Sequence, residues 1–320
     1  MDICLPETFS VLGAGNVATA LSKALAQKGI RPLIVASRTL ESAENLAAHL
    51  DGANAVSLSD LLESNDLPGD LVVFSVSDDA LLQVAEAIAE KVARPMDDWA
   101  DRLVIHTSGT WTSDVLAPFE VAGALTASFH PLQTFTDRDP ETADPTRFSG
   151  LPIGIEGGEQ AVEAASAVAQ TLGAAPFTLS ASTKGLFHAA AVMASNYLVT
   201  LQAMAQELSE AALGENGPAS DRYRALFGTL TRQALSNALE LGPEDALTGP
   251  IVRGDVRVLR EHLHQIQGRA PHLIPVYTSL ATESIRLASE SGRVTDELAE
   301  AMLELLTEFL SSDSQDDTMD

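Results

Sequence analysis

The sequence contains a single cysteine, Cys4, among 320 residues. This scarcity excludes a disulfide framework or a cysteine metal cluster within one chain, and we expect Cys4 to be a small core residue. Long hydrophobic runs are also lacking: no stretch approaches about 18 uninterrupted apolar residues, so we expect no membrane span. The N-terminus does not resemble a signal peptide, because Asp2 and Glu7 interrupt it. These absences predict a soluble cytoplasmic protein.

Basic residues are scarce as well. The chain has 45 acidic residues against 19 basic ones, a net charge of −26, and its only lysines are Lys23, Lys28, Lys91 and Lys184. Such a surface repels nucleic acid and anionic membranes, so neither is expected as a partner. We hypothesise a halophilic protein that works in concentrated salt, where self-repulsion is screened; a merely acidic cytosolic protein is the alternative. A melting temperature indifferent to molar chloride would contradict the salt hypothesis.

Strand and helix patterns alternate through the first 180 residues. The expected strands are Thr8–Gly13, Leu33–Ser37, Ala55–Leu58, Leu71–Ser75, Leu103–Thr107, Ala124–Phe129, Pro152–Glu156 and Pro176–Leu179. The expected helices are 16–28, 41–49, 78–92 and 159–172. This alternation predicts an α/β fold with a doubly wound, mainly parallel sheet.

The first strand runs into Gly13-x-Gly15-x-x-Ala18, and a helix pattern follows directly. Gly13 permits a tight turn, Gly15 lets backbone N–H groups approach phosphates, and Ala18 lets the helix pack on its strand. A pyrophosphate there would face the positive end of the helix dipole. The motif predicts a dinucleotide site, with an ordinary tight turn as the alternative. The cofactor-binding residues predicted here are Gly13, Ala14, Gly15, Asn16 and Val17.

The end of the second strand discriminates between NAD and NADP. Enzymes that use NAD tend to place a carboxylate there for the ribose hydroxyls, and this chain has Ser37-Arg38-Thr39 instead. The two hydroxyls and the planar guanidinium of Arg38 suit a 2′-phosphate, so we predict NADP. An exposed loop arginine is the alternative. At the end of the fourth strand, Ser75, Val76 and Ser77 are predicted to lie along the nicotinamide half.

The pattern changes after Ser180 and becomes almost wholly helical, with helices expected at 181–213, 219–240, 254–265, 270–291 and 295–311. We predict a Rossmann-like dinucleotide-binding domain over 7–180, a helical substrate and dimerisation domain over 181–312, and an acidic disordered tail over 313–320. The polar segment 136–149 is expected to be a surface loop, with an active-site lid as the alternative.

Residues 164–206 contain one charged side chain, Lys184, so we expect this window to be largely buried. A buried lysine is costly unless it has a partner or a role. His188 lies one helical turn further on the same face, and Asn196 lies beside the continuation of that face. We predict that Lys184, His188 and Asn196 orient and protonate a carbonyl or imine that receives hydride. The alternatives are a lysine whose amine reaches water, a core histidine and an amide bonded to backbone.

Two more histidines follow strands at the carboxyl edge, where open α/β sheets bind ligands. His130, which precedes Pro131, is predicted to be a general acid or a substrate ligand. His106 begins His-Thr-Ser-Gly and is left without an assigned role, whereas Ser108 is predicted to bind substrate. No metal is predicted, because the histidines lack the tight spacing of ligands.

A third cluster spans Thr248 to Asp255, where Gly249-Pro250 sets a rigid loop. Arg253 is predicted to hold a substrate carboxylate through paired hydrogen bonds, with Thr248 and Asp255 beside it. A helix N-cap is the alternative role for Asp255.

These motifs together resemble a family of Rossmann-like proteins with a C-terminal helical domain of unknown function. The resemblance covers about residues 7–290. It rests on Gly-Ala-Gly-Asn-Val-Ala at 13–18, His-Thr-Ser-Gly at 106–109, Ser-Phe-His-Pro-Leu-Gln-Thr-Phe at 128–135, the helix carrying His188 and Asn196-Tyr197, and Leu-Thr-Gly-Pro-Ile-Val-Arg-Gly-Asp at 247–255. It implies an NADP-linked oxidoreductase fold and supplies no substrate.

More distant resemblances point the same way. The glycine loop resembles that of pyrroline-5-carboxylate reductase, and the layout is similar to the 6-phosphogluconate and β-hydroxyacid dehydrogenases. Those dehydrogenases have Asn four residues after the catalytic lysine, where this chain has His188. His130-Pro131 is similar to the His-Pro of prephenate dehydrogenases, without the rest of their signature. Related folds pair two chains through the helical domain, which implies a homodimer.

We therefore interpret the chain as an NADP-dependent oxidoreductase that transfers hydride to or from a small carbonyl or imine substrate. The alternative is a non-catalytic NADP-binding sensor or partner protein, which the glycine loop fits equally well. Convergence of Lys184, His188 and His130 on the nicotinamide would favour the enzyme.

Overall fold

The computed structural model describes residues 5–64, 66–92, 99–137, 139–214 and 219–316. It divides into two compact units, Met1–Asn196 and Tyr197–Asp320, so the division falls later than the boundary predicted after residue 180. Helix α7 (Lys184–Ala194) therefore belongs to the first unit. Cys4 and residues 317–320 of the predicted tail lie outside the described residues, and α13 (Asp296–Asp316) extends into the start of that tail.

The first unit contains an eight-stranded sheet in the order β3-β2-β1-β4-β5-β6-β7-β8. Its strands are β1 (Thr8–Leu12), β2 (Arg31–Ser37), β3 (Asn54–Ser57), β4 (Leu71–Phe74), β5 (Leu103–His106), β6 (Leu125–Pro131), β7 (Pro152–Gly157) and β8 (Ala175–Thr178). All neighbouring strands are parallel except β6 and β7. This confirms the predicted doubly wound, mainly parallel sheet. The strand expected to end at Phe129 continues through His130 and Pro131.

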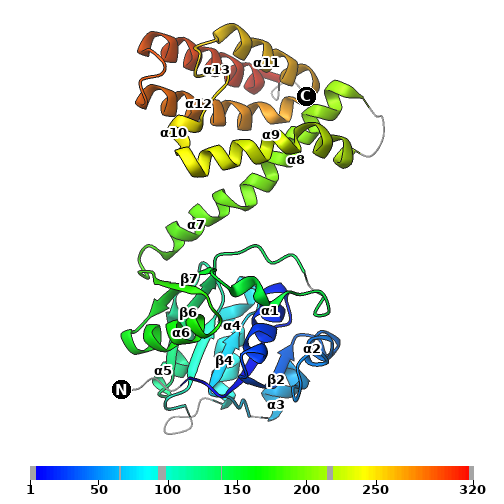
Figure 1. Ribbon diagram of the computed structural model, residues 1–320, viewed down its shortest axis with the longest axis vertical. Coiled ribbons are helices and arrows are strands. Elements are labelled where there is room, and N and C mark those ends of the chain that lie inside the picture. Colours follow the sequence, from blue (N-terminus) through cyan, green and yellow to red (C-terminus); the bar gives the residue numbers. More distant parts are fainter. Residues whose placement is uncertain (1–4, 65, 93–98, 138, 215–218, 317–320) are drawn as a thin grey trace. The chain divides into compact units, whose positions relative to one another are not determined.

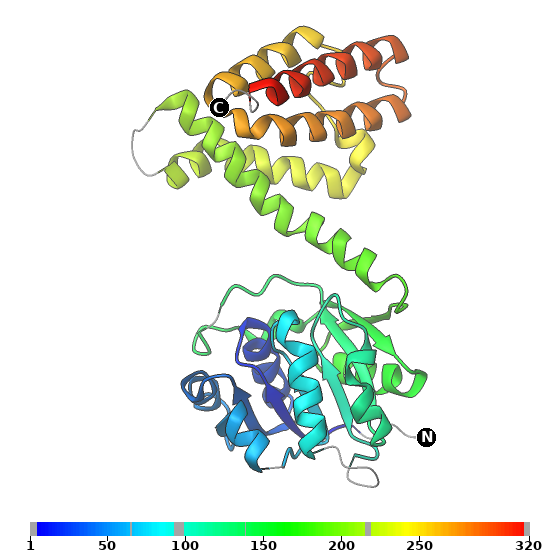
Figure 2. The same cartoon turned by 180° about the vertical axis from the view of Figure 1, so that it is seen from behind.

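Helices cover both faces of this sheet (Figures 1 and 2). One face packs against α1 (Asn16–Gln27), α2 (Leu40–Ala47) and α6 (Glu159–Thr171). The other packs against α3 (Leu58–Ser64), α4 (Asp78–Val92), the short 3₁₀ helix η1 (Ser113–Leu116) and α5 (Ala117–Val121). Residues alternate between the faces along each strand, so Val73 packs with α1 and Val72 with α4. Ile105, Ala127 and Ile155 face the α1 side. The polar residues that directly follow them, His106, Ser128 and Glu156, therefore face the α4 side.

The second unit is helical, as predicted. It comprises most of α8 (Asn196–Leu213), then α9 (Ala219–Leu241), α10 (Pro243–Ala246), α11 (Val256–Arg269), α12 (Ile274–Glu290) and α13. Its core lies among α11, α12 and α13, around Leu263, Ile285 and Met302. The single helix expected over 181–213 is broken at Ser195, where the backbone leaves the helical conformation (φ −122°, ψ −68°) and α7 ends. Among the described helices, none is both long and apolar enough to cross a membrane.

The weakly charged window at 164–206 is buried only in part. Its first portion, on α6, packs into the sheet's core, but Lys184 is the only buried residue of α7 and α8 has none. Leu186 is 76% exposed and Val199 is 69% exposed. On α9, Leu230 and Leu239 are exposed as well. The expectation of burial is therefore wrong within one chain for α7 and for the part of α8 inside this window.

Candidate active site at the carboxyl edge of the sheet

The glycine loop after β1 is shaped by two glycines with different surroundings. Gly13 has φ +119°, and a Cβ there would lie 2.0 Å from the carbonyl oxygen of Ser75. Its N–H donates to the carbonyl of Ala36 at 2.7 Å. Gly15 is the N-cap of α1, and a Cβ there would meet nothing within 4 Å. The loop thus packs tightly on β4 and leaves open space at the amino end of α1, which fits a pyrophosphate.

Asn16 and Lys23 tie α1 to the polar segment beyond β6. Asn16 Nδ2 donates to the carbonyl of Phe135, and the buried Asn16 Oδ1 has no hydrogen-bond partner. Lys23 Nζ donates to the carbonyls of Pro140 and Ala143. These bonds hold the segment along α1, and the 3₁₀ helix η2 (Pro145–Phe148) buries Phe148 in the core.

Arg38, which follows β2, is a cation available to bind an anion. Arg38 is exposed and forms no salt bridge within the described part of the chain. The hydroxyl of Thr39 is already used, because it caps α2 by accepting from the N–H of Ser42. Ser37 is half-buried beside them.

A line of contacts leads from the glycine loop to the next strand ends. Ser75, which touches Gly13, shares a hydrogen bond with the hydroxyl of Thr107 at 3.0 Å. Val76 and Ser77 then lead into α4. Thr107 starts the segment that we call the 107–113 loop, comprising residues 107–113. The carboxyl ends of β4 and β5 are thereby joined.

His106 holds the 107–113 loop from below. It is fully buried, its Nδ1 accepts from the N–H of Ser108 at 3.2 Å, and its Nε2 donates to the carbonyl of Thr112 at 3.1 Å. Burial, and then the charge of Lys184, lower the pKa of His106 to about 3, although the bond to Thr112 opposes them. The ring is therefore neutral and carries its proton on Nε2, which gives it a role in holding the loop.

Lys184 lies under the same loop. It is 1% exposed, and its Nζ donates to the carbonyl of Ser108 at 2.9 Å and to Ser128 Oγ. Burial lowers the pKa of Lys184 to about 8, while the carboxylates of Glu156 and Asp78 oppose this shift. The ammonium form is therefore retained at neutral pH, and the side chain does not reach water.

Glu156 is a buried acid that the sequence analysis did not identify as a site residue. Its carboxylate accepts from the N–H of Ser113 at 2.8 Å and from Ser113 Oγ at 2.9 Å. An acid inside an apolar strand, after Ile153 and Ile155, is the signal that could have revealed it.

His130 and His188 meet above the loop. Their ring centroids are 5.5 Å apart, at an interplanar angle of 60°. A Cβ on Gly109 would lie 2.2 Å from His188 Nδ1 and 2.8 Å from His130 Cε1, so only glycine fits between the loop and these rings. Both Nδ1 atoms are buried without a hydrogen-bond partner. Burial, then the charges of Lys184 and His188, lower the pKa of His130 to about 4.

The structure thus gathers four of the predicted residues, namely Ser108, His130, Lys184 and His188. Asn196 follows the helix break at Ser195 and begins α8, where its Oδ1 accepts from Ser195 Oγ at 3.0 Å.

The remaining substrate-binding candidates lie in the second unit. Asp255 caps α11 by accepting from the N–H of Val258 at 3.2 Å, whereas Thr248 and Arg253 are exposed. A role for these residues in binding substrate stays a prediction.

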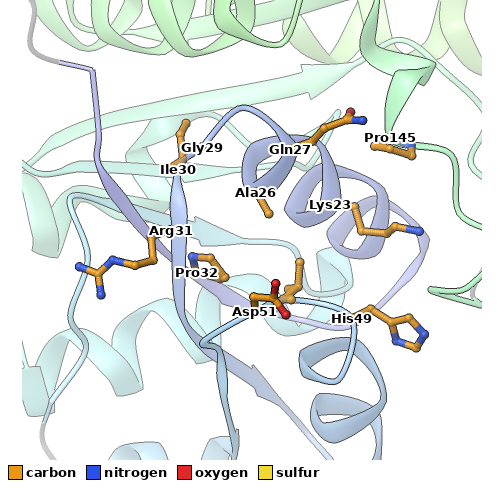
Figure 3. Close-up of a pocket in the computed structure, with 11 residues that line it drawn as sticks. Lys23, Ala26, Gln27, Gly29, Ile30, Arg31, Pro32, His49, Asp51 and Pro145 are labelled. Carbon is orange, nitrogen blue, oxygen red and sulfur yellow. The ribbon is translucent and has the colours of Figure 1, made fainter.

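A groove of about 480 Å³ lies elsewhere on the first unit (Figure 3). It runs between α1 and the loops that precede β2 and β3, at the amino edge of the sheet. Arg31 and His49 lie on opposite sides of it, and Lys23 is bound to carbonyls, so its cations do not converge. None of the predicted site residues lines it. We place the candidate site at the carboxyl edge, where the orphaned imidazole nitrogens are.

Two family models match separate stretches of the chain. Residues 5–103 match the family model for shikimate/quinate 5-dehydrogenase. Residues 151–284 match the family described as a domain of unknown function, DUF2520. The second match begins at β7 and includes both Glu156 and Lys184. The chain therefore combines a Rossmann-like domain with a C-terminal helical domain, as the sequence motifs implied.

Solved structures and curated relatives agree with the fold. A Bacteroides fragilis protein described provisionally as an NADP oxidoreductase has a TM-score of 0.70 and 28% identity, over 88% of this chain and 98% of that one. An imine reductase from Myxococcus stipitatus has a TM-score of 0.57 and 21% identity, over 95% and 99%. Glutamyl-tRNA reductase from Methanococcus maripaludis is 35% identical over 94 residues, 27% of this chain. The chain spans about a quarter or less of the length of such curated relatives, 24% in this case. The fold is that of an oxidoreductase.

Proposed function

We propose that the protein is an NADP-dependent oxidoreductase that transfers hydride between nicotinamide and a small carbonyl or imine. The observation that carries this is the continuous line of contacts at the carboxyl edge of the first unit. It runs from Gly13 through Ser75 and Thr107 to Gly109, which abuts two imidazoles with free nitrogens. A dinucleotide site and a polar cluster suited to a substrate are thereby neighbours.

The residues at the glycine loop fit such a cofactor. The amino end of α1 is open at Gly15, and Arg38 is free to bind a 2′-phosphate. Bound there, the nicotinamide would supply or accept the hydride. The Bacteroides fragilis protein and the Myxococcus stipitatus imine reductase, whose descriptions name NADP, support this choice of cofactor.

The chain's own side chains would act on the substrate. The Nδ1 atoms of His130 and His188 are placed to bind a substrate oxygen or nitrogen and polarise it. Lys184 fixes the carbonyl of Ser108, and its charge adds to burial in lowering the pKa of His130. Arg253 of the second unit would hold a substrate carboxylate, with Thr248 and Asp255, and Asn196 would bind a polar group of the substrate.

Binding and turnover test the function in sequence. In calorimetry with NADP and NAD, Arg38→Ala should weaken NADP binding by about 10-fold, since a charge-assisted contact contributes roughly 1.5 kcal/mol or more, and should leave NAD unchanged. Arg31→Ala, at the other end of β2, is the matched control. A screen of keto and imino acids for NADPH oxidation follows. Tight NADP binding without turnover would support a sensor instead, and equal binding of both cofactors would refute the NADP assignment.

We also propose that the protein is a homodimer. The exposed apolar side chains of α7, α8 and α9 are the support for this, together with the near absence of charge at 164–206. Apolar faces of this extent are typical of surfaces that pair with another protein. A second copy of the chain offers the same faces, so a closed two-fold pairing would bury them.

A further inference from the structure

Three polar residues form a row across neighbouring strands beneath the candidate site. His106 of β5 pairs with Ser128 of β6, and Ser128 pairs with Glu156 of β7. All three are buried and face the α4 side of the sheet. Directly paired residues project from the same face, so these side chains are adjacent in the protein interior. A buried polar row in an apolar sheet is costly unless its members are bonded.

The bonds of this row converge on the 107–113 loop. Lys184 donates to the carbonyl of Ser108, near the start of the loop. Glu156 accepts two hydrogen bonds from Ser113, at the end of the loop. His106 bonds to the backbone of both Ser108 and Thr112. Gly109, midway between these anchors, is the residue that abuts His130 and His188.

Lys184 on α7 places a positive charge near Glu156 of this row. Lys184 donates to Ser128 Oγ, and Ser128 is the strand partner of Glu156. The other titratable groups around the ammonium are His106 and His130 on the sheet, His188 on α7 and Asp78 on α4. Among the groups that favour the ammonium, Glu156 has the larger influence and Asp78 the smaller. A buried ammonium without a counter-charge would be strongly disfavoured.

We infer that Glu156 is a positioning residue of this site, which supplies the negative charge that keeps Lys184 ionised and, with Lys184, fixes both ends of the 107–113 loop. It does not touch the substrate. It acts through the loop, whose Gly109 sets how close the backbone comes to the two imidazoles. This inference rests on the proposed function, because that function is what makes the cluster an active site. Its test nevertheless requires no enzymatic turnover.

The scarcity of lysine makes the test direct. In protein labelled with ¹³C-lysine, the ε-carbons of four lysines titrate, and a Lys184→Met spectrum assigns Lys184. Glu156→Gln keeps the size of the side chain and an acceptor for Ser113 while removing the charge. We expect it to lower the pKa of Lys184 from about 8 by about one pH unit or more, as loss of a nearby opposite charge does. Glu163→Gln, an exposed acid on α6, should leave this pKa unchanged.

A double variant covers the case in which Glu156→Gln alone is too unstable to titrate. The single variant leaves a buried ammonium uncompensated, so Lys184→Met combined with Glu156→Gln should melt at a higher temperature than Glu156→Gln. An unchanged pKa of Lys184 in Glu156→Gln would overturn the inference. So would a double variant no more stable than the single one. Absence of NADPH oxidation would refute the proposed function and leave both of these measurements intact.

Discussion

At the scale of single residues, the sheet supplies the site with imidazoles that stay neutral. The pKa of His106 lies at about 3 and that of His130 at about 4, through burial and the charge of Lys184. A neutral imidazole binds and polarises a substrate but has no extra proton to give at neutral pH. This favours His130 as a substrate ligand over His130 as a general acid.

The depressed pKa of His130 also predicts how stability responds to acid. The unfolded chain, with a pKa near 6.5, binds this proton more readily than the folded one, so the contribution is complete above about pH 6.5 and is lost as the pH falls toward 4. The loss amounts to roughly 3 kcal/mol between pH 7 and pH 4, at about 1.4 kcal/mol per pH unit. His130→Gln should therefore show a weaker decline in denaturant titrations across this range. His49→Gln, on an exposed histidine, is the control, and an unchanged decline in His130→Gln would contradict the pKa.

Several residues of the candidate site could be predicted because they are polar or charged within an apolar stretch of sequence. Lys184 is a charge in an apolar window, and His188 follows at helical spacing. Glu156 was missed, because one acid at the end of an apolar strand is typical of a solvent-facing residue. Its burial becomes evident only from the sheet order, in which β7 lies between β6 and β8. Gly109 was not singled out either, since the packing of two rings against it depends on strands that are distant in sequence.

At the scale of elements, the two glycines of the loop after β1 are expected to serve different purposes: Gly13 stability and Gly15 cofactor binding. Gly13→Ala should destabilise the fold by about 1–3 kcal/mol, because its φ is +119° and the new Cβ would lie 2.0 Å from the Ser75 oxygen. Gly15→Ala should melt like the wild type, since φ is −83° and the position is open. The methyl group would instead occupy the approach to α1 and weaken NADP binding by about 10-fold, as loss of one charge-assisted hydrogen bond would.

Thermal melting and calorimetry on both variants check this prediction. Gly158→Ala, at the open N-cap of α6, serves as the control for adding a methyl group at a helix start. If Gly15→Ala bound NADP as tightly as the wild type, the pyrophosphate would not lie at α1.

Alternating patterns were enough to predict the elements of the sheet, because parallel strands buried on both faces are apolar almost throughout. The antiparallel direction of β7 could not be predicted, since an apolar run reads the same whether its strand is parallel or antiparallel to its neighbour. The break at Ser195 was missed because apolar residues continue on both sides of it, and no glycine or proline marks the point where the backbone leaves the helical conformation.

At the scale of the whole molecule, the proposed homodimer rests on the exposed apolar side chains of α7, α8 and α9. Leu239 on α9 is 79% exposed and Leu230 is 65% exposed. We expect Leu230→Asp combined with Leu239→Asp to raise the dimer dissociation constant by at least about 100-fold, since losing two buried leucines costs roughly 3 kcal/mol or more. Sedimentation velocity across a concentration series measures this.

The control for this experiment is an exposed apolar residue outside these faces. Val121 on α5 is 84% exposed, and Val121→Asp should leave the sedimentation unchanged. A wild-type chain that sediments as a monomer at all concentrations would refute the dimer. The sequence could indicate only that 164–206 needed burial, because an apolar pattern does not distinguish a core from a surface shared with another chain.

The placement of the four lysines has a practical consequence for surface chemistry. All of them precede Tyr197, so the second unit has no side-chain amine. Lys184 is buried and Lys23 is bonded to two carbonyls, which leaves the exposed Lys28 and Lys91 as the reactive side chains. Amine coupling to a sensor chip would thus attach the protein through its sheet-containing unit and leave every helix of the second unit unmodified.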